Sequence, residues 1–171
     1  MSETVYLSLG SNLGDRENNL VRAVEAISAL EGFETVTCSS LYISQPVEMD
    51  DKAPDFMNMV IEGRYQYRPM ELLNNLQSIE KKLGRTGKGE LKPRTIDIDI
   101  ILFGKQVIEM NDLSIPHRKM LQREFVLAPL LEIDKKLIHP VTREKISVYY
   151  REIKSKDLTL YKEFSTKDAR T

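Results

Sequence analysis

The sequence is poor in cysteine, in surplus charge and in long apolar runs, and each shortage excludes a class of protein. Its single cysteine, Cys38, excludes an internal disulfide. Lysine and arginine number 25 against 26 acidic residues, so a net charge of −1 indicates no nucleic-acid partner. No run approaches the roughly eighteen apolar residues of a membrane span, and "MSETVYLSLG" has no basic region before an apolar stretch. We therefore expect a cytoplasmic protein without a membrane partner.

Length and composition favour one domain across residues 1–171. A hydrophobic share of 41% is enough for a single core of ordinary size. We expect the motif-bearing part to span about residues 4–150, followed by a charged and loosely held tail over 151–171.

Hydrophobic periodicity predicts a mixed α+β fold. Alternating apolar residues and helical repeats, bounded by glycine and proline, predict strands over 5–9, 33–43, 56–65 and 93–104, and helices over 20–30, 69–83 and 124–132. A hairpin turn is expected at Gly104 and Lys105, leading into a further strand in "QVIEM", residues 106–110. The order βαββαββ is typical of the ferredoxin-like split βαβ pattern, with helices on one face of a largely antiparallel sheet. An extra C-terminal hairpin or helical region would follow.

The stretch "PRTIDIDIILFG", residues 93–104, places two acids in an apolar strand. Alternate side chains of a strand face opposite sides, so Asp97 and Asp99 share one face. The opposite, core-facing side is predicted to carry Ile96, Ile98, Ile100 and Leu102. The two carboxylates could hold one or two hard divalent cations. A lone Asp-x-Asp is more often a solvated face, so its neighbours must decide.

Residues 81–94, "KKLGRTGKGELKPR", form a glycine-containing loop with six basic residues against one glutamate. Guanidinium groups match phosphate oxygens in bidentate geometry, so Arg85 and Arg94 are candidates for a phosphate clamp. The alternative is a solvated basic loop. The "TGKG" segment fails the P-loop pattern, because Lys82 and Gly89 occupy positions that require glycine and serine or threonine.

Other polar and aromatic residues fall at suggestive spacings. Phe56 and Asn58 lie two apart on one strand face, where a ring could stack on a heterocycle while an amide binds its edge. Core packing of Phe56 explains that spacing equally well. Gln77 and Glu80 share a helix flank, which surface polarity also explains. His117 begins the basic cluster "HRKMLQR", whereas His139 is expected to be structural.

In this order and at these spacings, the motifs "LGSNLGD", "PDFMNMV", "QSIEKKLGR", "PRTIDIDIILFG" and "IPHRKMLQREFVLAPLLEI" resemble the 6-hydroxymethyl-7,8-dihydropterin pyrophosphokinase family of the folate pathway. The resemblance spans residues 7 to about 133. It implies a usually monomeric enzyme that transfers pyrophosphate from MgATP to the pterin hydroxymethyl oxygen and releases AMP, with two Mg²⁺ ions.

The resemblance also implies roles for individual residues. Asp97 and Asp99 would hold the metal ions, and Arg85 and Arg94 would contact the phosphates. The ATP site would be lined by Gln77, Arg85, Arg94, Ile100, His117, Arg118 and Arg123. The pterin site would be formed by Ser44, Val47, Phe56, Asn58, Asp97 and Phe125. Glu80 falls beside this chemistry without an assigned role.

This chain departs from the family pattern at several positions. Leu91 and Lys92 stand before Pro-Arg where many members have a bulky and then a small residue, and Arg118 replaces an aromatic residue of some relatives. Two other functions are compatible with paired aspartates or a ferredoxin-like sheet. They are a two-metal nucleotidyltransferase and a non-enzymatic binding module, although the module's usual aromatic signature is absent.

Overall fold

The structure, a computed structural model, describes residues 1–46, 49, 52–84, 94–154, 156–165 and 167–168. Its first half contains β1 (Glu3–Ser11), α1 (Arg16–Ser28), β2 (Phe33–Cys38), β3 (Leu41–Ser44), β4 (Phe56–Tyr65) and α2 (Pro69–Lys82). Its second half contains β5 (Asp97–Phe103), β6 (Ile108–Glu109), β7 (Ser114–Ile115), a 3₁₀ turn (Met120–Gln122), α3 (Glu124–Ile133), α4 (Ile146–Glu152) and β8 (Thr159–Lys162).

An antiparallel sheet forms the centre of the molecule. Its strand order is β5-β1-β4-β3-β8, and β2 pairs with the other end of β4. The predicted strand over 33–43 is therefore two strands, which pair with successive parts of β4. Ser39 lies in the break between them and accepts a hydrogen bond from the amide of Val60 at 2.9 Å. This bond satisfies a buried amide where the strand is interrupted.

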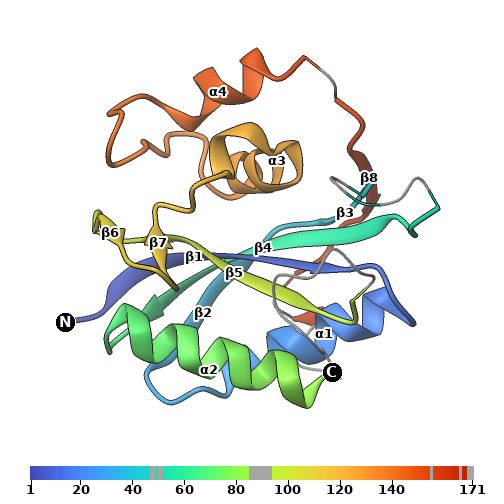
Figure 1. Cartoon of the computed structure of the whole chain (residues 1–171), viewed down its shortest axis with the longest axis horizontal. Coiled ribbons are helices and arrows are strands. Elements are labelled where there is room, and N and C mark those ends of the chain that lie inside the picture. The colour runs from blue at the N-terminus through green and yellow to red at the C-terminus, as the bar shows by residue number, and fades with distance from the viewer. Residues whose placement is uncertain (47–48, 50–51, 85–93, 155, 166, 169–171) are drawn as a thin grey trace.

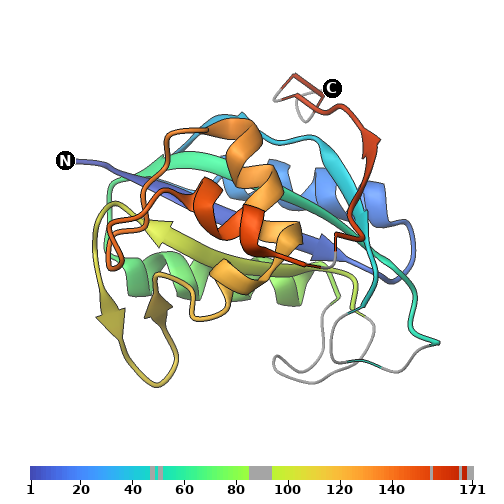
Figure 2. The ribbon, with the colours of Figure 1, turned by 90° about the horizontal axis from the view of Figure 1, so that it is seen from above.

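Helices cover both faces of this sheet (Figures 1 and 2). Helices α1 and α2 lie on one face, while α3 and α4 lie on the other. Each face has its own apolar cluster, because the sheet side chains alternate between the two sides. The prediction of helices on one face therefore holds for α1 and α2, but it did not place α3 and α4 on the other face. The second layer arises from α3, whose ten residues are almost entirely apolar and need a sheet surface to cover.

The two helices of the first layer agree in part with the sequence prediction: α2 begins at Pro69 as expected, whereas α1 begins at Arg16, before the expected residue 20. The Asp15 side chain accepts from the Asn18 amide at the start of α1, and Pro69 opens α2. Gly32 and Gly84 follow these helices with φ of 76° and 93°, a conformation that glycine adopts without steric cost. The helix boundaries near the later site are thus set by local sequence.

Strand β5 contains a bulge, and because of it Leu102 faces the side opposite to the predicted one. Its pairing with β1 shifts register between Tyr6 and Leu7, so that Ile101 is the extra residue. Ile98 and Ile100 consequently face the α1/α2 side as predicted, whereas Leu102 lies in the cluster under α3. A period of two cannot anticipate an inserted residue, which reverses every face beyond it.

The segment after β5 also differs from the prediction. The chain turns at Gly104, but β6 pairs with β7 rather than with β5. The expected hairpin of β5 with "QVIEM" is therefore wrong. At the C-terminus, β8 pairs with β3, and Phe164 is buried in the core on the α1/α2 side. The described part of the tail is thus ordered by the sheet. None of the described helices is long and apolar enough to cross a bilayer.

His139 has the structural role that the sequence predicted. Its side chain is 7% exposed, and its Nδ1 atom accepts from the amides of Val141 and Thr142, each at 3.3 Å. Burial lowers the pKa of His139, because the charged imidazolium loses hydration.

This environment predicts a pH-dependent stability. Because the folded pKa lies below the unfolded one, the unfolded chain binds a proton first as the pH falls. The free energy of unfolding should therefore decrease as the pH drops below about 6.5. His139→Asn, whose amide oxygen can accept the same bonds without titrating, should reduce that dependence in urea unfolding at about pH 7.5 and about pH 5.5. Equal pH dependence in both proteins would exclude His139 as the responsible group.

Candidate functional site

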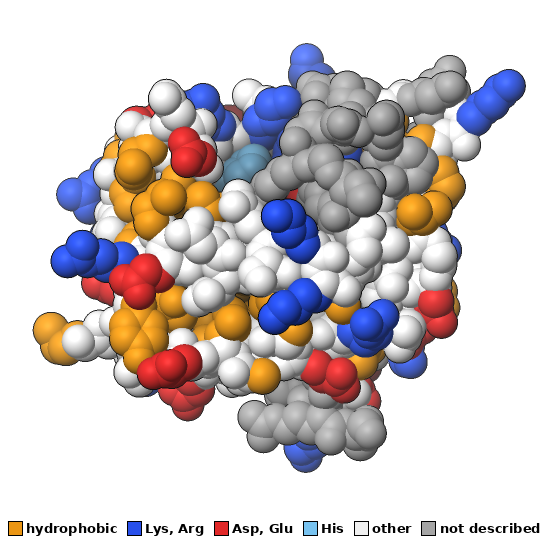
Figure 3. Space-filling view, turned by 60° about the horizontal axis from the view of Figure 1, so that its bottom comes forward, with side chains coloured by type: hydrophobic (Ala, Val, Ile, Leu, Met, Phe, Trp, Pro, Cys, Tyr) orange, Lys and Arg blue, Asp and Glu red, His pale blue; other side chains and the backbone are white. Residues whose placement is uncertain are grey.

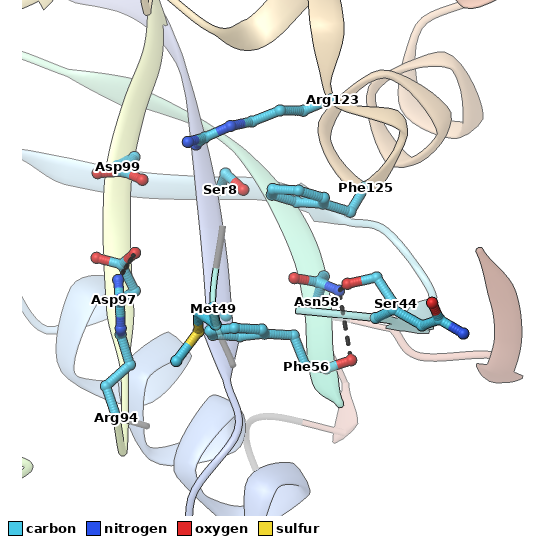
Figure 4. Close-up of a pocket in the computed structure, with 12 residues that line it drawn as sticks. Ser8, Ser44, Met49, Phe56, Asn58, Arg94, Asp97, Asp99, Arg123 and Phe125 are labelled. Carbon is cyan, nitrogen blue, oxygen red and sulfur yellow. Dashed lines mark hydrogen bonds and ion pairs between the residues drawn. The ribbon is translucent and has the colours of Figure 1, made fainter. Parts of the chain in front are cut away.

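Asp97 and Asp99 lie on the edge strand β5 and line one wall of a cavity (Figure 4). Their side chains are 22% and 26% exposed, so both reach solvent from a strand whose other face is core. The residues around the cavity come from β1, β3, β4, β5, α3 and the segments between them: Ser8, Gly10, Ser44, Gln45, Met49, Phe56, Asn58, Arg94, Asp97, Asp99, Arg123 and Phe125. The two acids thus face a space enclosed by distant parts of the chain.

Arg94 is held at the edge of this cavity by its backbone. Its amide donates to Oδ1 of Asn12 at 2.8 Å, and its carbonyl accepts from the Asn12 amide at 3.1 Å. The guanidinium donates to Oδ2 of Asp97 at 3.1 Å and lies 5.8 Å from the centre of the Phe56 ring. Only 16% of the Arg94 side chain is exposed. Asn12 therefore places one cation between the acids and the aromatic wall.

Phe56, Asn58 and Ser44 form the wall opposite the acids. They come from adjacent strands, since Ser44 pairs with Phe56 across β3 and β4. The Asn58 Nδ2 atom donates to the Ser44 hydroxyl at 2.7 Å, and Asn58 is 3% exposed. Gly10 leaves room for the side chains of Asn58 and Phe56, because a Cβ at this position would lie 3.3 Å from Asn58 Oδ1 and 3.4 Å from the Phe56 ring. The amide is therefore fixed beside the cavity, with a polar edge available to a ligand.

Arg123 and Phe125 close the cavity from the other layer. Phe125 belongs to the first turn of α3, and the Arg123 guanidinium lies 5.5 Å from the centre of its ring. Figure 4 shows the rings of Phe125 and Phe56 on opposite sides of the space, with Asn58 between them. Two rings facing a common gap, with an amide at its side, suit a flat heterocycle with polar edges.

A second cavity adjoins the first through Asp99. It is lined by residues of α2, β5 and the segment from 111 to 118: Leu73, Ile98, Asp99, Ile100, Asn111, Asp112, Leu113, Ser114, His117 and Arg118. The His117 Nε2 atom lies 4.0 Å from Oδ2 of Asp99. Arg118 and Glu109, each with a 64% exposed side chain, form an ion pair at 3.0 Å. Asp99 is thus shared by an aromatic cavity and a cavity with basic side chains at its edge.

Glu80 fixes the backbone between the two acids from the opposite layer. It lies on α2 and is 3% exposed, so surface polarity does not explain it. Its Oε1 atom accepts from the Ile98 amide at 2.8 Å. An edge strand has one row of backbone groups without a strand partner, and here the carboxylate supplies an acceptor. Glu80 therefore holds β5 at the residue between Asp97 and Asp99.

Most of the predicted site residues line one of these two cavities. The first cavity contains Ser44, Phe56, Asn58, Arg94, Asp97, Asp99, Arg123 and Phe125, and the second contains Asp99, Ile100, His117 and Arg118. Gln77 is half-buried on α2 and lines neither cavity. Arg85 and Val47 lie outside the described residues, as do Leu91 and Lys92.

Sequence reasoning missed several residues of the first cavity. Ser8, Gly10 and Gln45 line this cavity but were not among the predicted site residues, and Asn12, which holds Arg94 without lining the cavity, was also missed. The alternation of β1 would have placed Ser8 and Gly10 on one face. Met49 carried no recognisable signal, because it reaches the cavity from an irregular segment.

The role of Glu80 can be tested by its loss and by its conservative replacement. Glu80→Ala should leave the buried Ile98 amide without this acceptor and lower the free energy of unfolding by about 1–3 kcal/mol. Glu80→Gln keeps an acceptor oxygen and should recover most of that loss. Urea unfolding measures both variants. Equal stability of the alanine variant and the wild type would contradict the proposed hydrogen bond.

Comparison with known proteins gives a consistent family. Residues 6–135 match the family model described as 7,8-dihydro-6-hydroxymethylpterin-pyrophosphokinase. A 2-amino-4-hydroxy-6-hydroxymethyldihydropteridine pyrophosphokinase of Bacillus subtilis (strain 168) is 44% identical over 133 residues, which cover 78% of this chain and 79% of that protein. The enzyme of the same name from Haemophilus influenzae is 42% identical over 137 residues, with 80% and 85% covered.

Some relatives are much longer than this chain. The folic acid synthesis protein fol1 of Pneumocystis carinii is 42% identical over 157 residues, which are 92% of this chain but 21% of that protein. Among solved structures, wild-type Plasmodium falciparum HPPK-DHPS with pteroate matches with a TM-score of 0.71 and 13% identity, covering 89% of this chain and 44% of that one. At that identity the structural match supports the fold alone.

Proposed function

Because the chain belongs to the 7,8-dihydro-6-hydroxymethylpterin-pyrophosphokinase family, we propose that it transfers pyrophosphate from MgATP to 6-hydroxymethyl-7,8-dihydropterin. The products would be the pterin diphosphate and AMP, in tetrahydrofolate biosynthesis. The observation that carries this proposal is the pair Asp97 and Asp99, which stands on a rigid edge strand and faces a cavity bounded by two phenylalanine rings.

The fold supports the ferredoxin-like assignment as part of this proposal. Strands β1 and β2 both run antiparallel to β4, which lies between them, so β1-α1-β2 is a βαβ unit split by a third strand. Strands β4 and β5 are likewise both antiparallel to β1 and are connected through α2. The two helices of these units share one face of the sheet.

The pterin would occupy the cavity between Phe56 and Phe125. Its fused rings are flat and could stack on both phenylalanines, which contributes binding energy beyond that of buried area. Asn58 would bond to the polar edge of the heterocycle, because its Nδ2 atom is oriented by Ser44. Asp97 lines the same cavity and would lie near the hydroxymethyl group. Burial between two rings would orient that group toward the acids.

The triphosphate would lie across β5, between the two cavities. Arg94 and Arg123 line the first cavity, and His117 and Arg118 line the second. Guanidinium groups neutralise phosphate charge through bidentate hydrogen bonds, and phosphoryl transfer depends mainly on such positioning and neutralisation. Ile100 would provide an apolar contact for the nucleotide in the second cavity.

The carboxylate oxygens on β5 suit Mg²⁺. We propose that Asp97 and Asp99 hold two Mg²⁺ ions. Mg²⁺ prefers oxygen ligands and is usually bound by one or two carboxylates together with substrate phosphates. Within the described part of the chain, no group of three or more histidine, cysteine or acidic residues could hold a metal, so two carboxylates fit this mode better than an all-protein cage. Bound Mg²⁺ would supply charge stabilisation to the phosphates during transfer.

The reaction needs no nucleophile from the protein. The pterin hydroxymethyl oxygen would form a bond to the β-phosphorus of ATP while the bond from that phosphorus to the oxygen of AMP breaks. The hydroxyl proton passes to solvent, and AMP carries away the electron pair of the broken bond. Arg94 is fixed by Asn12 and Asp97, so its charge requires little rearrangement as the phosphate charge redistributes.

The two alternative functions are less well supported. A nucleotidyltransferase would share the paired acids, yet the family match extends over residues 6–135, and the relatives from Bacillus subtilis and Haemophilus influenzae carry the pyrophosphokinase name. A nucleic-acid binding module would favour a basic surface. Figure 3 shows basic and acidic side chains interspersed on the face of α1 and α2.

The activity predicts a specific nucleotide product. Incubation of the protein with MgATP and 6-hydroxymethyl-7,8-dihydropterin should yield AMP and the pterin diphosphate in equal amounts, measured by anion-exchange chromatography. Omission of the pterin is the control for background hydrolysis. Formation of ADP, or of pyrophosphate with a nucleotidylated product, would contradict pyrophosphoryl transfer.

The metal assignment predicts the effect of removing each charge. Asp97→Asn and Asp99→Asn should each lower kcat by about a hundredfold or more, because the phosphates lose their bound cations. Both variants should unfold at a temperature close to that of the wild type, since neither side chain belongs to the core.

Asp55→Asn provides a matched control for these variants. Asp55 is exposed, precedes Phe56 and lines neither cavity, so this charge change should leave kcat within about twofold of the wild type. If either β5 variant retained wild-type turnover at ordinary Mg²⁺ concentrations, the metal assignment would be abandoned.

A further inference from the structure

The C-terminal segment, defined here as residues 156–165, contacts α3 and β3, which carry two walls of the first cavity. This segment lies outside the family match over residues 6–135. It contains β8 and the turn that precedes it. Figure 2 shows it running beside β3 after the chain has left α4. The family match over residues 6–135 does not include this segment, so that match assigns it no role.

The first contact is made to the start of α3. Oε2 of Glu124 accepts from the amide of Asp157 at 2.8 Å and from the amide of Leu158 at 3.1 Å. Glu124 lies between Arg123 and Phe125 in sequence and is the first residue of the helix. A carboxylate with two backbone donors forms charge-assisted hydrogen bonds, which are stronger than those between neutral groups.

The second contact is made to the wall that carries the amide. Strand β8 pairs with β3 on the side away from β4, with Thr159 opposite Ile43 and Leu160 opposite Tyr42. The next residue of β3 is Ser44, whose hydroxyl accepts from Asn58. One short segment therefore connects the start of α3 with the strand beside Asn58.

The far end of the segment is anchored in the main core. Phe164 is 8% exposed within the apolar cluster of α1, α2 and the sheet. Lys162 also donates to Glu17 of α1 at 2.7 Å. The segment is thus held at Phe164, along β3 and at Glu124, so the position of its two amides is fixed by the sheet rather than by α3.

The first turn of helix α3 needs a contact of this kind to hold its position relative to the sheet. Its other end is held by Glu132, whose Oε1 atom accepts from the amide and the hydroxyl of Ser40 at 2.9 and 2.7 Å. The first turn has no side-chain cap from Arg123, and first turns fray when their backbone groups are unsatisfied. Phe125 lies in this turn, so any movement there changes the distance between the two stacking rings.

We propose that Glu124 is a positioning residue that sets the ring of Phe125 opposite Phe56 by holding the amides of Asp157 and Leu158 in the C-terminal segment. This inference rests on the proposed function, because it assigns the aromatic gap to the pterin. Glu124 does not line the cavity, so it acts through Phe125. The affinity for the pterin should depend on it strongly, while the affinity for ATP should change little, because Arg94, His117 and Arg118 do not belong to this turn.

The test compares three variants of the full chain. Glu124→Ala removes the acceptor, and Glu124→Gln retains one acceptor oxygen. Glu17→Ala removes the contact with Lys162 at the opposite end of β8. For each, the KM values for 6-hydroxymethyl-7,8-dihydropterin and for ATP are measured with kcat, and binding of the pterin is followed by its own fluorescence. Thermal unfolding reports general destabilisation, and hydrogen exchange reports protection of the Asp157 and Leu158 amides.

Glu124→Ala should raise the pterin KM and dissociation constant by about five- to tenfold, the range expected when a stacking contact is weakened. The ATP KM should stay within about twofold, and the two amides should lose protection. Glu124→Gln should restore most of the pterin affinity. Glu17→Ala should lower thermal stability slightly and leave both KM values unchanged.

Two results would overturn the inference while leaving the proposed function intact. One is wild-type pterin affinity in Glu124→Ala when the wild type forms AMP. The other is an equal loss of pterin affinity in Glu17→Ala and Glu124→Ala, which would indicate general loosening of β8. Failure of the wild type to form AMP would instead refute the proposed function itself.

Discussion

The hydrogen bond from the Ile98 amide to Glu80 is the constraint on which the rest of the site depends. Strand β5 lies at the edge of the sheet, and among the described residues β1 is its one strand partner. An edge strand presents backbone groups that could pair with water and let the strand move. A buried carboxylate from α2 removes that freedom at the residue between the two acids, so the carboxylates of Asp97 and Asp99 project from a backbone held on both sides.

The remaining parts of the site are arranged around this strand by the two helical layers. Arg94 belongs to the segment before β5 and is fixed by Asn12. Arg123 and Phe125 lie at the start of α3, on the face of the sheet opposite α1 and α2. The bulge at Ile101 lets β5 pack against both layers, because Ile98 and Ile100 lie in the cluster of α1 and α2, whereas Ile101 and Leu102 lie in the cluster under α3. The cavity is therefore formed between the sheet and the start of α3, with β5 and the segment before it as one wall.

Local patterns anticipated much of this arrangement. The alternation of Asp97 and Asp99 with isoleucine placed the acids on one face, and the spacing of Phe56 and Asn58 put them together on another strand. Proline and glycine indicated the start of α2 and the approximate ends of α1 and α2, whereas the cap at Asp15 was not predicted. The errors arose where a long-range partner decided the outcome. Periodicity could not show the bulge, the pairing of β6 with β7, or the second helical layer.

The sequence by itself determined which side chains could perform the chemistry: two carboxylates two residues apart on a strand, arginines that suit phosphate, and an aromatic ring with an amide at strand spacing. These properties depend on residue type and local geometry alone. Only the tertiary structure decided that Phe125 faces Phe56, that Asn12 holds Arg94, and that Glu80 is buried under β5. Each of these contacts joins residues far apart in sequence, so it exists only once the sheet and both helical layers have packed.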